Sequence, residues 1–196
     1  RTGSGKTAAY LLPLLQGALA RAERGGAGSV GSAGARGDGT SSRRKVAAAS
    51  GDGGESGGVY GVVLVPTQEL VEQVHAQLRQ LMYYCSDVLR SAKLAKKSDA
   101  VALRDAPNIV VSTPYQLVKQ LESGKGSKEL LRDVGMLVVD EADLVLSYGS
   151  EEDIRRVSNA LPRTAQSLLL SATLSDELQA LKKVMLHKPV TLQLKE

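Results

Sequence analysis

The sequence predicts an α/β fold in which a mostly parallel β-sheet carries helices on both of its faces. Two observations lead to this prediction. Short runs rich in Val, Leu and Ile recur along the chain, at residues 59–65, 108–113, 136–140 and 166–173. Segments with apolar residues at helical spacing separate these runs. Strands that are apolar at nearly every position must be buried on both sides, which is typical of a parallel sheet between two layers of helices.

The segments between the strands are expected to be helical. Residues 7–24 are dense in Ala and Leu, and Pro13 is the one residue there that disfavours a helix. Residues 67–84 place apolar side chains at helical spacing. Helices are also expected over 114–123, 151–161 and 175–186, and a last strand over 190–194.

Residues 25–58 interrupt this alternation. The stretch holds more than half of the chain's 20 Gly and has no apolar periodicity. Such a composition buries too little apolar surface to offset the entropy lost on ordering. We therefore expect a disordered Gly/Ser/Arg-rich insertion on the surface, for which a solvated linker is favoured over an RNA contact.

Composition bounds the class of protein only loosely. The chain has 196 residues, of which 42% are hydrophobic, enough for one domain with a packed core. Its single Cys, Cys85, excludes an internal disulfide and suits a reducing compartment. No apolar run is long enough for a membrane-spanning helix, so no membrane partner is expected. The formal net charge of +4 favours an anionic partner only weakly.

The chain opens on RTGSGKT, which matches most of a phosphate-binding loop. Small residues let successive backbone N–H groups face a phosphate, Lys6 can reach the β- and γ-phosphates, and the Thr7 hydroxyl can hold Mg²⁺. The alternative, a plain Gly-rich turn before a helix, is disfavoured by the Gly-Lys-Thr order. The residues expected to bind ATP are Thr2, Gly3, Ser4, Gly5, Lys6 and Thr7.

The run VVDEAD, at residues 138–143, is a second candidate for site chemistry. A buried strand ends in Asp140, so its carboxylate is expected at the edge of the sheet where ligands bind in open α/β folds. Asp140 is suited to position Mg²⁺ directly or through water, and Glu141 to polarise the attacking water. Acidic residues also suit the first turn of a helix, but the apolar strand before them and the phosphate-binding loop favour a catalytic set of Lys6, Asp140 and Glu141.

A third motif, SAT, ends the next apolar strand. Ser171 and Thr173 are expected to emerge near the carboxylates. Alone, such residues are ordinary caps for the helix that follows. The tripeptide gains a functional interpretation only from the other two motifs.

These three motifs in this order resemble the first RecA-like domain of DEAD-box RNA helicases, with TGSGKT as motif I, DEAD as motif II and SAT as motif III. The resemblance covers nearly the whole chain outside the insertion. It implies a RecA-like P-loop fold, ATP and Mg²⁺ as ligands, and RNA as a partner. It also implies that ATP and RNA are coupled through Asp143, Ser171, Ala172 and Thr173.

Two further segments resemble the RNA-binding motifs of the family, with one change each. PTQELVEQ stands where the family has PTRELAxQ, and TPYQ stands where TPGR is usual. Gln68 and Gln116 therefore replace Arg, and each loses a charged contact to the RNA phosphodiester. The resemblance implies RNA contacts from Pro66, Thr67, Gln68, Thr113 and Pro114.

The sequence after motif II is more specific. DEADLVLSYGSEEDI, and the segment from LPRTAQSLLLSAT to VTLQL, resemble the nucleolar DEAD-box helicases that act in large ribosomal subunit assembly. This resemblance implies a location in the nucleus and nucleolus, with pre-ribosomal RNA and pre-ribosomal proteins as partners.

The resemblance also implies segments outside residues 1–196. These residues correspond to the helicase ATP-binding domain without the strand that leads into the loop and without the Q motif that recognises adenine. A second RecA-like domain would supply arginine fingers and half of the RNA site. We therefore expect the isolated chain to be inactive.

Three classes of function remain open from the sequence. The first is the ATP-binding half of an ATP-dependent RNA helicase that remodels RNA duplexes or RNA–protein complexes. The second is a non-hydrolysing fragment that binds RNA or a partner, and the third is an unrelated P-loop NTPase. The order of GKT, PTQEL, DEAD and SAT disfavours the third. Sequencing the full transcript separates the first two.

Overall fold

A computed structural model describes residues 5–26, 58–123, 127–173, 175–186 and 188–192. Nearly all of the predicted insertion lies outside the described residues, as do Thr2, Gly3 and Ser4. Within the described ranges, no helix is long and apolar enough to cross a membrane.

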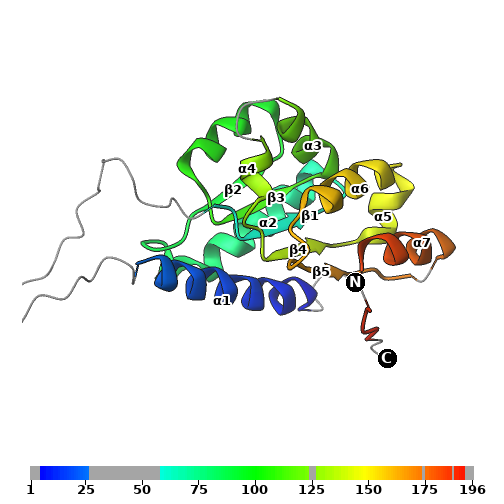
Figure 1. The fold of residues 1–196 in the computed structure, drawn as a ribbon, viewed down its shortest axis with the longest axis horizontal. Coiled ribbons are helices and arrows are strands. Elements are labelled where there is room, and N and C mark those ends of the chain that lie inside the picture. The colour runs from blue at the N-terminus through cyan, green and yellow to red at the C-terminus, as the bar shows by residue number, and fades with distance from the viewer. Residues whose placement is uncertain (1–4, 27–57, 124–126, 174, 187, 193–196) are drawn as a thin grey trace, which may run out of the picture.

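A single parallel sheet of five described strands forms the centre of the fold (Figure 1). Its order is β2-β3-β1-β4-β5, and every neighbouring pair is parallel. The strands are β1 (Gly61–Leu64), β2 (Ser91–Leu94), β3 (Ile109–Ser112), β4 (Met136–Val139) and β5 (Gln166–Leu169). The predicted mostly parallel α/β fold is confirmed.

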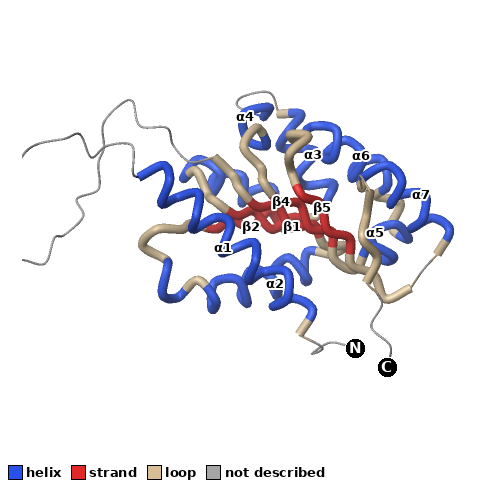
Figure 2. The backbone as a smooth tube through the Cα atoms, turned by 60° about the horizontal axis from the view of Figure 1, so that its bottom comes forward, coloured by secondary structure: helices blue, strands red, loops and turns tan. Residues whose placement is uncertain are grey.

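Helices cover the two faces of the sheet unequally. Figure 2 shows α1 (Lys6–Gly26) and α2 (Gln68–Leu81) on one side of the strands and the later helices on the other. The later helices are α3 (Pro114–Glu122), α4 (Ser127–Leu131), α5 (Ala142–Ser147), α6 (Glu151–Ala160) and α7 (Asp176–Met185). Two short 3₁₀ segments, η2 (Tyr83–Cys85) and η3 (Lys97–Asp105), flank β2.

The alternation of strand side chains explains the two layers. In β1, Val62 and Leu64 join the core cluster beneath α3, α5, α6 and α7, whereas Val63 joins the cluster beneath α1 and α2. Successive side chains of a strand point to opposite faces, so a run such as GVVL must be covered on both. All four residues of β1, β3 and β4 are buried accordingly.

The strand β5 is less covered than its neighbours. It lies at the edge of the described sheet, pairs with β4 alone, and its residues are half-buried or exposed. Leu168 packs against the α1/α2 cluster and Leu169 against the opposite one. A strand parallel to β4 is confirmed over Gln166–Leu169, but residues 170–173 of the predicted run are not in a strand, and the strand is not fully buried.

Several parts of the element prediction differ from the structure, and the short helices α4 and α5 and the 3₁₀ segment η3 were not predicted. The strand β2 was not expected, because its sequence SAKL alternates and buries only Ala92 and Leu94. The strand expected over 190–194 is wrong for residues 190–192, which form no strand, while 193–194 lie outside the described residues. Val190 and Leu192 are 86% and 87% exposed, so apolar composition without a paired neighbour does not make a strand there.

Candidate functional site

The predicted site residues follow the C-terminal ends of four neighbouring strands. Pro66 comes after β1, Thr113 after β3, Asp140 after β4 and Ser171 after β5. The register pairs Leu64 with both Ser112 and Val139, and Val139 with Leu169, so these ends lie level with one another. Because all strands are parallel, the polar residues converge on one edge of the sheet, as predicted.

The N-terminus of α1 contributes to this edge. Gly5 has φ +73°, a left-handed conformation that favours glycine, and the helix begins at Lys6. The carbonyl of Gly5 accepts a hydrogen bond from the Ala9 N–H at 3.0 Å, which fixes the turn to the helix. The first N–H groups of a helix have no partner within the helix, so they form a favourable environment for an anion.

Lys6 and Glu141 face each other across the site. Lys6 Nζ lies 3.9 Å from Glu141 Oε1, and each side chain is 33% exposed. A contact at this distance and exposure holds two charges near each other without locking either in place.

The Asp140 carboxylate is held on both oxygens. It is buried, its Oδ2 accepts a hydrogen bond from the Tyr10 hydroxyl at 2.8 Å, and its Oδ1 accepts one from the Glu141 N–H at 2.9 Å. The second contact depends on backbone conformation, because Glu141 sits at φ 50°, ψ 49° as the residue before α5. This left-handed conformation is unfavourable for residues other than Gly, Asn and Asp, and such strain concentrates at functional sites.

Tyr10 is the site residue that the sequence did not reveal. It lies in the first turns of α1, its side chain is 1% exposed, and its hydroxyl contacts a residue 130 positions later. Burial, and then the negative charge of Asp140, raise the pKa of the Tyr10 phenol well above its ordinary range, while a hydrogen bond with Thr7 acts in the opposite direction. The phenol therefore keeps its proton at neutral pH and donates it in the hydrogen bond to Asp140. From the sequence alone, a tyrosine on the apolar face of a predicted helix can be interpreted only as a core residue.

Motifs II and III contact each other directly. The Thr173 hydroxyl donates a hydrogen bond to Asp143 Oδ2 at 2.9 Å. The Ser171 hydroxyl donates to the Thr173 carbonyl at 2.9 Å, which folds the tripeptide into a turn, and the intervening Ala172 is exposed. Asp143 Oδ1 is buried and has no partner among the described residues. The expected proximity of the SAT segment to the acidic motif is thus present in the structure.

The residues predicted to contact RNA also have structural roles. Thr67 caps α2 by accepting a hydrogen bond from the Leu70 N–H at 3.2 Å. Thr113 caps α3 in the same way, with the Gln116 N–H at 3.4 Å, and the buried Pro114 occupies the first turn of that helix. Gln68, in contrast, is exposed. These residues lie at the same edge of the sheet as Asp140.

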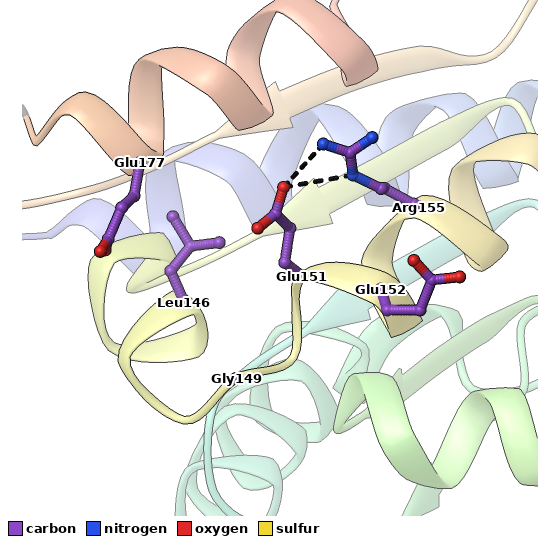
Figure 3. A pocket seen from close by; sticks show the side chains of 6 residues that line it. All are labelled: Leu146, Gly149, Glu151, Glu152, Arg155 and Glu177. Carbon is purple, nitrogen blue, oxygen red and sulfur yellow. Dashed lines mark hydrogen bonds and ion pairs between the residues drawn. The ribbon is translucent and has the colours of Figure 1, made fainter.

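Two surface cavities lie away from this edge. One, of about 530 Å³, is lined by residues of α5, α6, α7 and the loop between α5 and α6, and Figure 3 shows its Glu151 bonded to Arg155. The other, of about 470 Å³, lies at the end of α2 and the start of β2. Neither lining includes a residue of TGSGKT, DEAD or SAT. These two cavities are therefore distinct from the candidate site.

The fold and the site together define a class of protein. A parallel sheet that presents an Asp-Glu pair at a strand end, facing the Lys of a Gly-Lys-Thr helix start, is the arrangement of P-loop nucleoside triphosphatases. A sequence profile described as DEAD/DEAH box helicase matches residues 1–181. The chain belongs to the DEAD/DEAH box helicase family.

Relatives with curated names agree with this membership. The chain is 39% identical over 200 residues to a probable ATP-dependent RNA helicase ddx56 of Dictyostelium discoideum, covering 100% of this chain and 25% of that protein. It is 42% identical over 200 residues to the ATP-dependent RNA helicase dbp9 of Aspergillus oryzae, covering 100% of this chain and 28% of that protein. The chain thus spans about a quarter of the length of these relatives.

Known structures agree on the fold. Dbp5 of S. cerevisiae, in a complex with Gle1 and IP6, superposes with a TM-score of 0.70 at 21% identity, covering 100% of this chain and 41% of that one. A DEAD box protein from the hyperthermophile Methanococcus jannaschii superposes with a TM-score of 0.65 at 25% identity, covering 96% of this chain and 42% of that one. Both confirm the RecA-like architecture that the resemblance implied.

Proposed function

We propose that residues 1–196 are the ATP-binding domain, the first of two RecA-like domains, of an ATP-dependent RNA helicase. The observation that carries the proposal is the convergence of Lys6, Asp140 and Glu141 on one edge of the sheet in a member of this family. In such an enzyme, ATP binding and hydrolysis would drive the remodelling of RNA duplexes or RNA–protein complexes.

Lys6 is proposed to bind the β- and γ-phosphates of ATP. Its ion pair with Glu141 is long and a third exposed, so the ammonium group can move to an incoming phosphate at little cost. Backbone N–H groups at the start of α1 would bind the same phosphates, together with Thr2, Gly3 and Ser4, which lie outside the described residues.

Thr7 and Asp140 are proposed to hold Mg²⁺, directly or through water. The residues fit such an ion, because each carboxylate oxygen of Asp140 accepts only one hydrogen bond within the described residues and keeps a lone pair. Mg²⁺ prefers oxygen ligands and retains waters, so one or two protein groups beside substrate phosphates suffice. When bound, Mg²⁺ would neutralise charge that develops on the phosphates.

Glu141 is proposed to polarise the attacking water. Its carboxylate is partly exposed at the open edge, next to the cation proposed to bind the γ-phosphate. The left-handed backbone places Asp140 and Glu141 on one tight turn, so their adjacent carboxylates can take separate roles, one toward the metal and one toward water.

Asp143 and Thr173 are proposed to couple the nucleotide to RNA. Their hydrogen bond links the end of β5 to the acidic motif, and Ser171 stabilises the turn that presents Thr173. Ala172 lies exposed at the same turn. A change at the nucleotide could therefore shift the SAT segment relative to the strand ends that carry the RNA motifs.

RNA is proposed to lie along the edge formed by Pro66, Thr67, Gln68, Thr113 and Pro114. Thr67 and Thr113 are engaged as helix caps, so RNA contacts would come from backbone groups, helix N-termini and the exposed Gln68. With Gln in place of two Arg, we expect this domain alone to bind RNA weakly, with a shallow salt dependence.

The biological role is proposed from the resemblance after motif II and from the names of the relatives. The segment DLVLSYGSEEDI supports a place among nucleolar helicases that act on pre-ribosomal RNA and proteins. A second RecA-like domain, with arginine fingers, would complete the enzyme, and the greater length of the relatives supports this. The alternative is a fragment that binds RNA or a partner without hydrolysis.

The test is ATP turnover by the full-length protein, with and without single-stranded and duplex RNA. We expect turnover that RNA stimulates, and we expect Lys6→Ala to abolish it, because the loop loses the ammonium group proposed to bind the β- and γ-phosphates. A matched control is Lys183→Ala, which removes an exposed Lys of α7 outside the site. Turnover that neither RNA nor Lys6→Ala alters would contradict the helicase proposal, and RNA binding without turnover would favour the alternative.

A further inference from the structure

The Tyr10 hydroxyl forms a buried polar link between α1 and the end of β4, which also pack together through apolar side chains. It extends from α1 and donates a hydrogen bond to Asp140 Oδ2 at the end of β4, at 2.8 Å. Both residues are nearly enclosed, with Tyr10 1% and Asp140 7% exposed. A hydrogen bond to a charged acceptor in such surroundings is stronger than one at the surface.

The second contact of Asp140 completes the restraint. The Glu141 N–H donates to Oδ1 at 2.9 Å, so each oxygen has its own donor. Two donors on the two oxygens fix the carboxylate against rotation about its terminal torsion, which is otherwise broad. Each oxygen keeps a lone pair free for a further contact.

The position of Tyr10 in α1 gives this restraint a functional direction. Tyr10 lies three residues after Thr7, so the two side chains are neighbours on one face of the helix. Thr7 and Asp140 are the two residues proposed to hold Mg²⁺. The hydroxyl of Tyr10 therefore lies between the helix half and the strand half of that site.

We propose that Tyr10 is a positioning residue for Mg²⁺–nucleotide binding, and that its hydroxyl holds the Asp140 carboxylate in register with Thr7. The inference rests on the proposed function and deepens it by adding a residue outside the sequence motifs. It predicts that the hydroxyl, and not the aromatic ring, determines how strongly binding depends on Mg²⁺.

One substitution distinguishes the contribution of the Tyr10 ring from that of its hydroxyl. The Tyr10 ring packs in the cluster beneath α1 and α2, with Leu14 and Val138 among its members. Tyr10→Phe keeps that packing and removes only the donor to Asp140. Tyr60→Phe is a matched control, because Tyr60 packs against the same cluster but precedes β1, at the opposite end of the sheet.

The experiment measures binding of a fluorescent ADP to the full-length protein as Mg²⁺ is titrated. For Tyr10→Phe we expect the Mg²⁺ concentration at half-saturation to rise by about 10-fold, the size usual for loss of a group that orients a metal ligand. Affinity for the same nucleotide in EDTA should change by less than about 2-fold, because the phosphate-binding loop is intact. Tyr60→Phe should leave both quantities unchanged.

A double mutant separates positioning from general destabilisation. In an Asp140→Asn background, Tyr10→Phe should cause no further change in Mg²⁺ dependence, since the carboxylate that it positions is gone. An unchanged Mg²⁺ half-saturation in Tyr10→Phe, or an equal shift in the Asp140→Asn background, would refute the positioning role. If the unsubstituted protein binds no nucleotide in Mg²⁺, the proposed function itself fails and takes this inference with it.

Discussion

Glu141→Gln should greatly reduce ATP turnover while leaving the stability of this domain nearly unchanged. The substitution keeps the size and shape of the side chain and removes its charge. Among the described residues, the Glu141 carboxylate forms one ion pair, with Lys6 at 3.9 Å, and both side chains are 33% exposed. Exposed pairs contribute about 0.2–1 kcal/mol, and one at the limit of contact belongs at the low end of that range.

The expected effect on stability is therefore small. A loss below about 0.5 kcal/mol in a domain of this size shifts Tm by less than about 2 °C. The left-handed backbone at φ 50° is equally unfavourable for Glu and Gln, so the substitution adds no strain. Affinity for ATP should be retained, because one negative charge near the phosphates is removed and the loop is unchanged.

The expected effect on turnover is much larger. Removing a group that takes a proton from the attacking water typically costs about 10²–10⁴-fold in rate. This corresponds to about 3–5 kcal/mol of barrier, several times the predicted change in stability. RNA-stimulated phosphate release by the full-length protein measures the first quantity, and a thermal melt measures the second.

Glu177→Gln is the matched control, since it removes an exposed carboxylate of α7 outside the site. The control should match the unsubstituted protein in both assays. If Glu141→Gln retains turnover within about threefold, Glu141 does not polarise the water. If its Tm falls by more than about 5 °C, Glu141 holds the fold and the loss of activity says nothing about chemistry.

Two further predictions concern the fold. Gly17→Ala would ordinarily stabilise a helix by about 0.5–1 kcal/mol, but here an added Cβ would lie 2.1 Å from the Tyr60 hydroxyl. We therefore expect a net loss of about 1–3 kcal/mol in the free energy of unfolding, measured by chemical denaturation, and relief of this loss when Tyr60→Leu is added. A stabilised single mutant would show that the Tyr60 ring moves freely. Replacing residues 27–57 by a short Gly-Ser linker should change the free energy of unfolding by less than about 1 kcal/mol. A short linker can join the two ends, because Arg21 near the end of α1 and Gly58 before β1 both lie against Asp133. A large fall in Tm would show that the replaced segment packs on the domain.

The layers of the fold and the location of the site were predictable because both depend on local patterns. Runs such as VVLV and LVV are apolar at every position, which already requires a strand covered on both sides. Once the strands are parallel, the residue that follows each one must lie at a common edge. Asp140 and Ser171 could therefore be placed near each other, and near Lys6, without coordinates.

The edge strands of the sheet were less predictable, because a strand at an edge is not apolar at every position. Among the described strands, β2 is paired on one side only and is less buried than the central strands. Ser91 and Lys93 therefore remain partly exposed, and Lys93 forms an ion pair with Glu72 of α2. The alternating pattern of β2 is short and resembles a polar segment. At residues 190–192 a strand was predicted that the structure does not contain, because the apolar residues there are not paired with a described strand.

Tyr10 shows a limit of a different kind. Its ring obeys the helical period and is buried as the pattern requires. The polar part of the side chain is the hydroxyl, whose partner Asp140 is 130 residues away. Periodicity reports which face a residue occupies but not which polar group lies opposite, so this contact required the tertiary structure.

The polar residues at this edge differ in how far the fold itself engages them. Thr67 and Thr113 each cap a helix, and Thr173 is bonded to Asp143, so substituting any of them disturbs structure as well as function. Lys6 and Glu141 are joined by the least restrictive contact of the set, at 3.9 Å and a third exposed. Groups that exchange protons or bind phosphates must be free to change partners during a reaction. The loosely paired ammonium and carboxylate are therefore better suited to the chemistry, and the tightly bonded hydroxyls to hold the edge in shape around them.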